Sequence, residues 1–215
     1  VAIGRIEHRL DLRMPAGVVG LEFFRCLRID AALAHADYTA LRAAQAERRD
    51  LAAQHRGGLD VAGGVEPQPT AIPHSSSDPA IVAGSAAIFS NQDFYDLCAR
   101  GGIGLVYLGC AQIDAEGRTN VSVIGPHEKP KVRLPGGGGA AVMLPTAQRV
   151  ATWRTEHTPR TLVEKLDFVT ASGNLAALVT PLAVFQRTTG RFRLESWHPD
   201  SSLDDVVKRT GFAFD

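Results

Sequence analysis

Little in this chain points to a charged or membrane-bound protein. Lysine and arginine total 23, and aspartate and glutamate also total 23, so the formal net charge is zero. A neutral chain has no overall electrostatic attraction for nucleic acid or for an anionic membrane. No apolar run approaches the ~20 residues that a membrane-spanning helix needs, and residues 1–15 carry scattered charges unlike those of a signal peptide. We therefore expect no nucleic acid and no membrane as partners.

Cysteine is scarce as well. The three cysteines are odd in number and lack the spacing of metal ligands: Cys26, Cys98 and Cys110. This pattern excludes a disulfide framework and favours reduced thiols in a cytoplasmic protein. Glu156 and His157 are adjacent, but no second ligand cluster accompanies them. We expect no metal site.

The second part of the chain carries consistent secondary-structure signals. Ser90 with Asp93, and Ser202 with Asp205, have the spacing of capping boxes and predict two short helices. Strand patterns cover residues 103–110, 119–125 and 149–155, residues 161–169 suggest a short helix running into a strand, and residues 177–197 suggest two strands around Thr188-Thr189-Gly190. Strands that alternate with short helices predict an α/β sandwich.

The first part of the chain is different in character. Residues 1–60 form an atypical segment, in which an alanine-rich stripe predicts a helix over about residues 30–54. Residues 56–79 are rich in glycine and proline and predict a loop. We therefore divide the chain into an N-terminal segment, 1–60, and an α/β domain, 61–215.

Four consecutive glycines, Gly136 to Gly139, are the first candidate for a functional site. Backbone N–H groups without side chains can converge on an anion, so the run suits a phosphate cradle or an oxyanion hole. No Gly-Lys-Ser/Thr follows, which excludes a P-loop. The alternative is a flexible surface turn.

The order of several short motifs resembles one enzyme family. Gly109-Cys110-Ala111-Gln112-Ile113 is followed by Gly117-Arg118-Thr119-Asn120 and then by Gly136-Gly137-Gly138-Gly139-Ala140. This succession, the C-terminal ESWHPDSSLDDVVKRTGFAF and the upstream PTAIPHSSSDPAIVAGSAAIF are similar to the β subunit of class I coenzyme A transferases of the glutaconate and 3-oxoacid type. The resemblance covers about residues 61–215. It implies a three-layer α/β sandwich, with a mostly parallel or mixed sheet and helices on both faces.

The resemblance also implies a chemistry. In this family a glutamate attacks an acyl-CoA thioester and forms an anhydride and then a glutamyl-CoA thioester. Gly137, Gly138 and Gly139 would stabilise the oxyanions, and Gln112 and Asn120 would hold the substrate at the strand ends. The alternative for both amides is to satisfy backbone groups of a turn. The implied substrates are an acyl-CoA and a small carboxylic acid, the implied partner is an α subunit of similar fold, and no cofactor would be bound permanently.

The match breaks where the nucleophile should lie. Ala62 occupies the position of the family's glutamate, and the nearest acid is Glu66. Glu66 is either a nucleophile in a shifted loop or a solvated carboxylate. An early apolar strand is not evident either, and two hypotheses address this. In the first, residues 1–60 are the translation of a gene segment in the wrong reading frame. In the second, the chain is a true variant that has lost the nucleophile.

Three functions therefore stay open. The first is the β subunit of a CoA-transferase, and the second is a subunit of a CoA-thioester hydrolase or ring-opening enzyme whose catalytic glutamate lies on the α partner. The third is a non-catalytic structural partner. Lys129, Lys131 and Arg133 form a basic patch that is either a solvated strand edge or a contact for CoA phosphates. His74 and His127 lack a paired acid, so we interpret both as structural.

Overall fold

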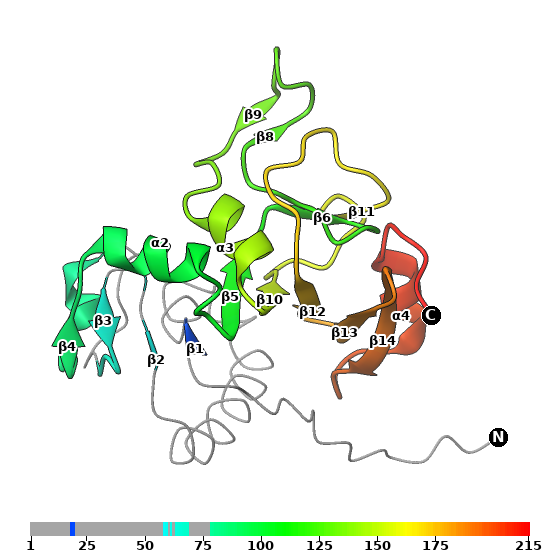
Figure 1. Cartoon of the computed structure of the whole chain (residues 1–215). Helices are drawn as coiled ribbons and strands as arrows, with labels where there is room; N and C mark the ends of the chain where they lie inside the picture. The colour runs from blue at the N-terminus through cyan, green and yellow to red at the C-terminus, as the bar shows by residue number, and fades with distance from the viewer. Residues whose placement is uncertain (1–17, 20–57, 60, 62, 69–77) are drawn as a thin grey trace.

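A mixed β-sheet dominates the chain, whose computed structural model describes residues 18–19, 58–59, 61, 63–68 and 78–215. Nine strands form this main sheet in the order β14-β13-β12-β10-β5-β1-β2-β3-β4 (Figure 1). Its parallel centre consists of β12 (Leu175–Val179), β10 (Arg149–Trp153), β5 (Leu105–Gly109), β1 (Val18–Val19) and β2 (Gly58–Leu59). The strands expected within 103–110 and 149–155 are thus confirmed. β1 pairs with both β5 and β2, so the chain has an early strand that the sequence pattern did not predict.

The two edges of the main sheet are antiparallel. One edge holds β13 (Ala183–Thr188) and β14 (Arg191–Trp197), and the other holds β3 (Gly64–Val65) and β4 (Ala87–Ile88). Residues 177–197 were expected to form two strands, but they contribute to three. Thr180 separates β12 from β13, because its hydroxyl donates to Ala183 O over 2.9 Å and accepts from Ala183 N over 3.1 Å.

Local capping fixes two of the three α-helices found among the described residues. In α2 (Asn91–Ala99), Asp93 N donates to Ser90 Oγ over 3.1 Å, and Ser90 N donates to Asp93 Oδ2 over 3.3 Å, which confirms the expected capping box. In α4 (Leu203–Arg209), Asp205 N donates to Ser202 Oγ over 3.1 Å. The third helix is α3 (Ala140–Thr146), and a short 3-10 turn, η1, covers Pro79–Val82. None of the described helices is long and apolar enough to cross a bilayer.

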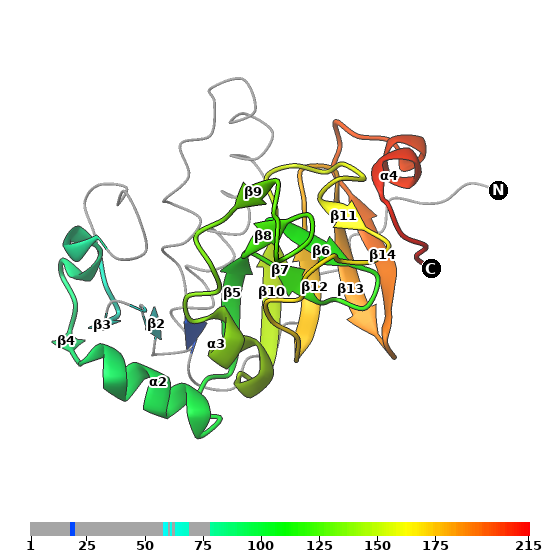
Figure 2. The same cartoon turned by 90° about the horizontal axis from the view of Figure 1, so that it is seen from above.

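A second layer lies over one face of the main sheet. It contains α2 and α3, which pack together, and a three-stranded sheet of β11 (Leu162–Val163), β6 (Gln112–Asp114) and β7 (Thr119–Asn120) (Figures 1 and 2). The hairpin β8 (Val123–Ile124) and β9 (Val132–Arg133) stands above this layer. The α/β class with a mixed sheet is confirmed, whereas the helix expected over 30–54 lies outside the described residues.

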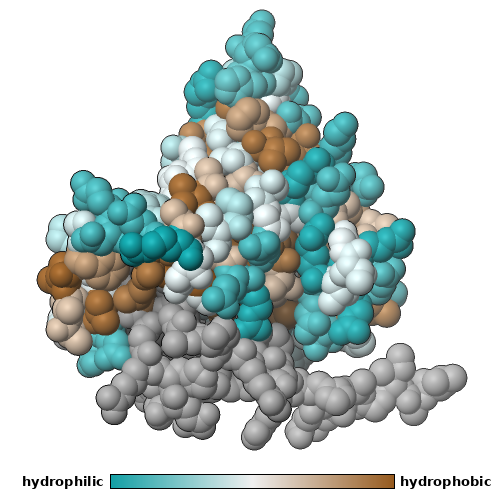
Figure 3. Space-filling view, viewed as in Figure 1, coloured by the Kyte–Doolittle hydropathy of each residue, from teal (hydrophilic) through white to brown (hydrophobic). Residues whose placement is uncertain are grey.

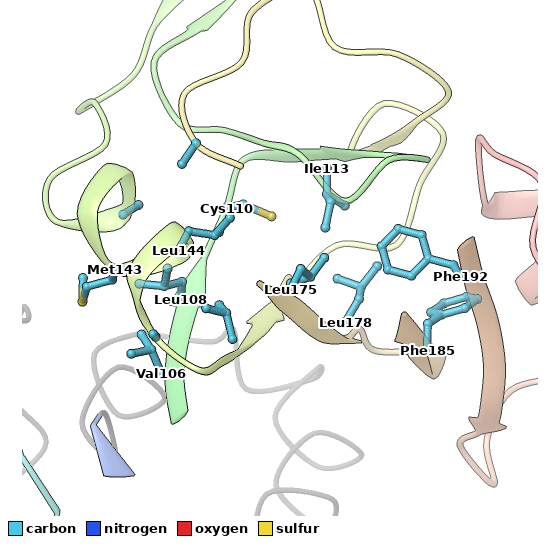
Figure 4. Close-up of a cluster of buried hydrophobic side chains, with 14 of the residues drawn as sticks. Val106, Leu108, Cys110, Ile113, Met143, Leu144, Leu175, Leu178, Phe185 and Phe192 are labelled. Atoms are coloured by element: carbon cyan, nitrogen blue, oxygen red, sulfur yellow. The ribbon is translucent and has the colours of Figure 1, made fainter. Parts of the chain in front are cut away.

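The hydrophobic core fills the space between these layers. Leu144 of α3 faces Val106 and Leu108 of β5, and Ile113 of β6 points toward Leu178 of the main sheet (Figure 4). Aromatic rings extend the same core toward the C-terminus, where Phe185 and Phe192 are fully buried. Each such side chain contributes about 2 kcal/mol by leaving water, so the core anchors both layers.

Residues 161–169 differ from expectation. They form the two-residue strand β11 followed by a loop, and no helix. The cause is a long-range pairing, in which Leu162 lies beside Ile113 in parallel register and is fully buried. Tertiary burial therefore overrides the local helical pattern.

His157 is a buried histidine that joins three distant segments. Its Nδ1 lies 2.8 Å from Thr180 Oγ1 and its Nε2 lies 2.9 Å from Thr210 Oγ1, and a neutral ring donates to one hydroxyl and accepts from the other. Burial, and then the charge of Arg209, lower the pKa of His157 to about 4. The folded state therefore holds this ring neutral at pH values where the unfolded chain protonates it.

We predict a pH-dependent loss of stability from this residue. Its contribution to the free energy of unfolding is complete above the unfolded pKa of ~6.5 and decreases as the pH falls toward 4. Urea unfolding at pH 7 and pH 4.5 should show a loss for the native chain that exceeds the loss for His157→Gln by about 2 kcal/mol. Equal losses in both proteins would contradict the assignment.

Candidate functional site

The candidate site begins where β5 leaves the main sheet. β5 ends at Gly109, and the chain continues through the buried Cys110 into β6 of the second layer. Open α/β sheets bind ligands beyond the carboxyl ends of their parallel strands. Burial raises the pKa of the Cys110 thiol to about 12, so Cys110 is a packed, protonated side chain and not a nucleophile.

A tight turn brings the two candidate amides together. The carboxylate of Asp114 is fully buried and accepts from Glu116 N, Arg118 N and Arg118 Nε at 3.1, 3.0 and 2.8 Å. Gly117 has a φ of +73°, and a Cβ there would lie 2.7 Å from Arg187 Nε, so only glycine fits. This turn sets the register of β6 and β7, in which Gln112 lies opposite Asn120. Residues 112–120 therefore form a β-hairpin.

Asn120 is fully buried, and its amide organises the chain that follows. Its Oδ1 accepts from Ser122 N at 3.0 Å and from Val123 N at 3.3 Å. Its Nδ2 donates to Val123 O at 2.6 Å and to Gln112 Oε1 at 3.0 Å. Gln112 Nε2 donates to Arg160 O at 2.9 Å. Both amides therefore hold backbone in this structure, and contact with a substrate stays a prediction.

The same amide ends β7 early. Residues 119–125 were expected to form one strand, but they split into β7 and β8, which belong to different sheets. The turn that the Asn120 side chain closes over Ser122 and Val123 is the physical reason.

The glycine run lies directly beside this turn. Gly136 N donates to Val121 O over 2.9 Å, which ties the run to the residue after Asn120. Within the described part of the chain, the N–H groups of Gly137, Gly138 and Gly139 have no hydrogen-bond partner. Gly138 has a φ of +50°, and a Cβ there would meet no atom within 4 Å. Unpaired backbone donors next to open space are suited to binding an anion.

Thr170 links the glycine run to Asn120, and the sequence gives no signal for it. Its hydroxyl accepts from Val121 N at 3.0 Å and lies 2.7 Å from Ser122 Oγ and 3.4 Å from Asn120 Oδ1. Its methyl group would lie 2.9 Å from a Cβ at Gly137. Because Thr170 follows Asn120 by 50 residues in the sequence, only the folded structure reveals this contact.

Glu66 lies apart from the glycine run and from Gln112 and Asn120. It follows β3 and is exposed, with a φ of +50°. In the main sheet β3 is the third strand from β5, past β1 and β2 (Figure 1), a separation of about 14 Å at the usual strand spacing. Because β3 is antiparallel to β2, the chain at Glu66 also runs away from the carboxyl ends of the parallel strands. The role of Glu66 as a nucleophile stays a prediction. Ala62 and His74 lie outside the described residues.

The remaining candidates are placed as follows. The ring of His127 stacks on Phe168 at a centroid distance of 4.8 Å, beside the β8–β9 hairpin. Lys129, Lys131 and Arg133 are exposed on the same hairpin. Among the residues that the structure describes, no group of three or more His, Cys, Asp or Glu side chains could hold a metal ion.

The hydrogen bonds of Asn120 generate a prediction about stability. Asn120→Leu keeps the volume but leaves several buried backbone groups unpaired, which should lower the free energy of unfolding by about 3 kcal/mol. Gln112→Leu, at a half-buried position, should cost about 1 kcal/mol. Urea unfolding of both variants checks this, and an equal or smaller loss for Asn120→Leu would show that its amide does not hold the turn.

The comparisons with known proteins all indicate one family. The coenzyme A transferase family profile matches residues 64–209. The chain is 31% identical over 170 residues to the B subunit of 3-oxoadipate CoA-transferase from Pseudomonas knackmussii, covering 70% of this chain and 65% of that protein. It is 28% identical over 171 residues to the B subunit of glutaconate CoA-transferase from Acidaminococcus fermentans, covering 68% and 64%.

A solved structure supports the same fold. The decarboxylase AibA/AibB superposes with a TM-score of 0.68 at 31% identity, over 74% of this chain and 66% of that chain. The present chain spans a little less than two thirds of the length of the curated relatives it matches. Since the profile covers more than half of its residues, the chain belongs to the coenzyme A transferase family.

Proposed function

We propose that this chain is the β subunit of a heteromeric CoA-transferase, which moves coenzyme A from an acyl-CoA to a small carboxylic acid. The observation that carries the proposal is the set of N–H groups at Gly137, Gly138 and Gly139, which are unpaired among the described residues, with open space beside Gly138. Family membership and the names of the two transferase relatives support it. Glutaconate and 3-oxoadipate, which those names contain, are the first acids to test.

The glycine amides would act on charge that develops during the reaction. A carboxylate oxygen attacks the thioester carbon, the C–S bond breaks and the CoA thiolate leaves, which forms an anhydride. The thiolate then attacks the enzyme's half of the anhydride, and the first acid departs. Each attack passes through an oxyanion, and a preorganised N–H donor stabilises such a species by about 3 kcal/mol.

Gln112 and Asn120 would contribute through the loop they hold. Both amides are engaged by protein atoms, and Asn120 is fully buried. We therefore propose that they fix the glycine amides in place before substrate binds. Preorganisation of this kind matters because donors that need no rearrangement are the effective ones in catalysis.

The location of Glu66 favours a second candidate function. An exposed carboxylate three strands away from β5 is poorly placed to attack an acyl group held at Gly138. We therefore keep the alternative in which the acting carboxylate belongs to an α partner and the enzyme cleaves an acyl-CoA without transfer. The relative named as a decarboxylase indicates that this fold is not confined to CoA transfer.

Borohydride trapping tests whether a covalent glutamyl-CoA intermediate forms on either subunit. The chain, purified together with the subunit that accompanies it, is incubated with an acyl-CoA and then with borohydride, which reduces a glutamyl-CoA thioester to an alcohol. The transferase proposal predicts a mass change on Glu66 or on a glutamate of the partner. An active complex with no modified glutamate in either subunit would exclude the covalent mechanism.

A second prediction concerns Gly138. A methyl group there enters the open space, so Gly138→Ala should reduce kcat about tenfold to 100-fold by displacing the reacting group. Gly190→Ala is the matched control, because Gly190 also has a positive φ, +85°, and open space around it, but lies in the β13–β14 turn. Both variants should lose about 1 kcal/mol of stability. Equal activity in the two variants would favour a purely structural role for this chain.

A further inference from the structure

The β8–β9 hairpin carries a concentration of positive charge in a neutral chain. Between residues 123 and 138 it holds one acid, Glu128, and three cations, Lys129, Lys131 and Arg133. All three cations are exposed, and the hairpin forms the hydrophilic tip of the molecule (Figure 3). We call these three residues the basic ribbon.

The basic ribbon has no acidic partner within the described residues. Five other arginines there are paired with carboxylates, such as Arg118 with Asp114 at 2.7 Å and Arg154 with Glu156 at 3.3 Å. Across the part of the chain that the structure describes, no such ion pair involves a member of the ribbon. The ribbon therefore presents uncompensated charge to an incoming anion.

Backbone pairing connects the basic ribbon to the glycine amides. Lys131 N donates to Ile124 O at 2.8 Å, Leu134 N to Ser122 O at 2.9 Å, and Gly136 N to Val121 O at 2.9 Å. The stack of His127 on Phe168 ties the tip of the hairpin to the loop that contains Thr170. Cations and glycine amides thus belong to one ordered stretch of chain and keep a defined separation.

The maximum span from Arg133 to Gly138 is comparable to the length of the CoA arm. About thirteen bonds join the sulfur of CoA to its first phosphorus, as many as in about four extended residues, or ~15 Å. Arg133 lies five residues before Gly138, a span of at most ~17 Å. An acyl group at the glycine amides would therefore leave the first phosphate within reach of Arg133, and Lys131 and Lys129 follow on the same hairpin.

We propose that Lys129, Lys131 and Arg133 bind the phosphate groups of the CoA substrate. Lysine and arginine form charge-assisted hydrogen bonds with phosphate oxygens, and arginine can do so in a bidentate manner. The inference rests on the proposed function, since it names the surface that holds the nucleotide end of that substrate. A contact between this hairpin and a partner subunit is the competing interpretation.

Calorimetric titration of the purified complex tests the proposal without turnover. The probes are CoA, dephospho-CoA, which lacks the 3′-phosphate, and pantetheine, which lacks the nucleotide. Lys131→Gln/Arg133→Gln should raise the Kd of CoA at least about tenfold, raise that of dephospho-CoA less, and leave that of pantetheine unchanged. Added salt should weaken CoA binding more in the native complex than in this variant.

A matched variant controls for net charge. Arg100→Gln/Lys208→Gln removes two exposed cations from helix ends distant in sequence from the hairpin and should leave all three Kd values unchanged. An unchanged Kd of CoA in the hairpin variant, or an equal rise for pantetheine, would overturn the proposal. Loss of the partner subunit from the hairpin variant alone would also overturn it. A complex that binds CoA as predicted but shows no trapped glutamate would refute CoA transfer and leave this inference intact.

Discussion

The side chain of Asn120 is the constraint on which the candidate site depends. Its amide closes the turn over Ser122 and Val123, ends β7, and sends the chain out of the second layer into the β8–β9 hairpin. The return strand of that hairpin then delivers Gly136 to Val121 O. Without the buried amide, neither the direction of the hairpin nor the position of the glycine run would be fixed.

Two further contacts make this arrangement rigid. Asp114 and Gly117 set the register that places Gln112 opposite Asn120, and Thr170 braces the turn from a distant loop. The result is a well-supported loop whose last three glycine amides are left without protein partners among the described residues. Gly138 is exposed and Gly137 and Gly139 are half-buried, so this supported loop leaves its unpaired donors accessible to a ligand.

The sequence predicted the features that depend on neighbouring residues. Ser90 and Ser202 cap their helices, β5 forms where an apolar run indicated it, and β10 forms where an alternating pattern indicated it, because these signals act over a few residues. The features it missed depend on distant pairings. β11 forms because Leu162 lies beside Ile113, and Thr170 reaches Asn120 across 50 residues.

The candidate site also combines features that the sequence predicted with features that depend on long-range contacts. The order of the motifs located the glycine run near Gln112 and Asn120, and the structure places these residues together. The sequence could not show that both amides are already engaged, because Arg160 and Val123 become their partners only in the folded chain. It also could not show that Glu66 follows an antiparallel edge strand, which depends on the pairing of β3 with β2 and β4.

Hydrogen exchange at the glycine run tests the central claim most directly. The amides of Gly137, Gly138 and Gly139 should exchange rapidly in the free complex, since protein partners are absent among the described residues. Binding of a non-reactive acyl-CoA analogue should slow their exchange at least about tenfold while the β13–β14 turn is unaffected. Amides that are already protected without ligand, or that exchange equally fast with it, would contradict the assignment of this loop as the acyl-binding site.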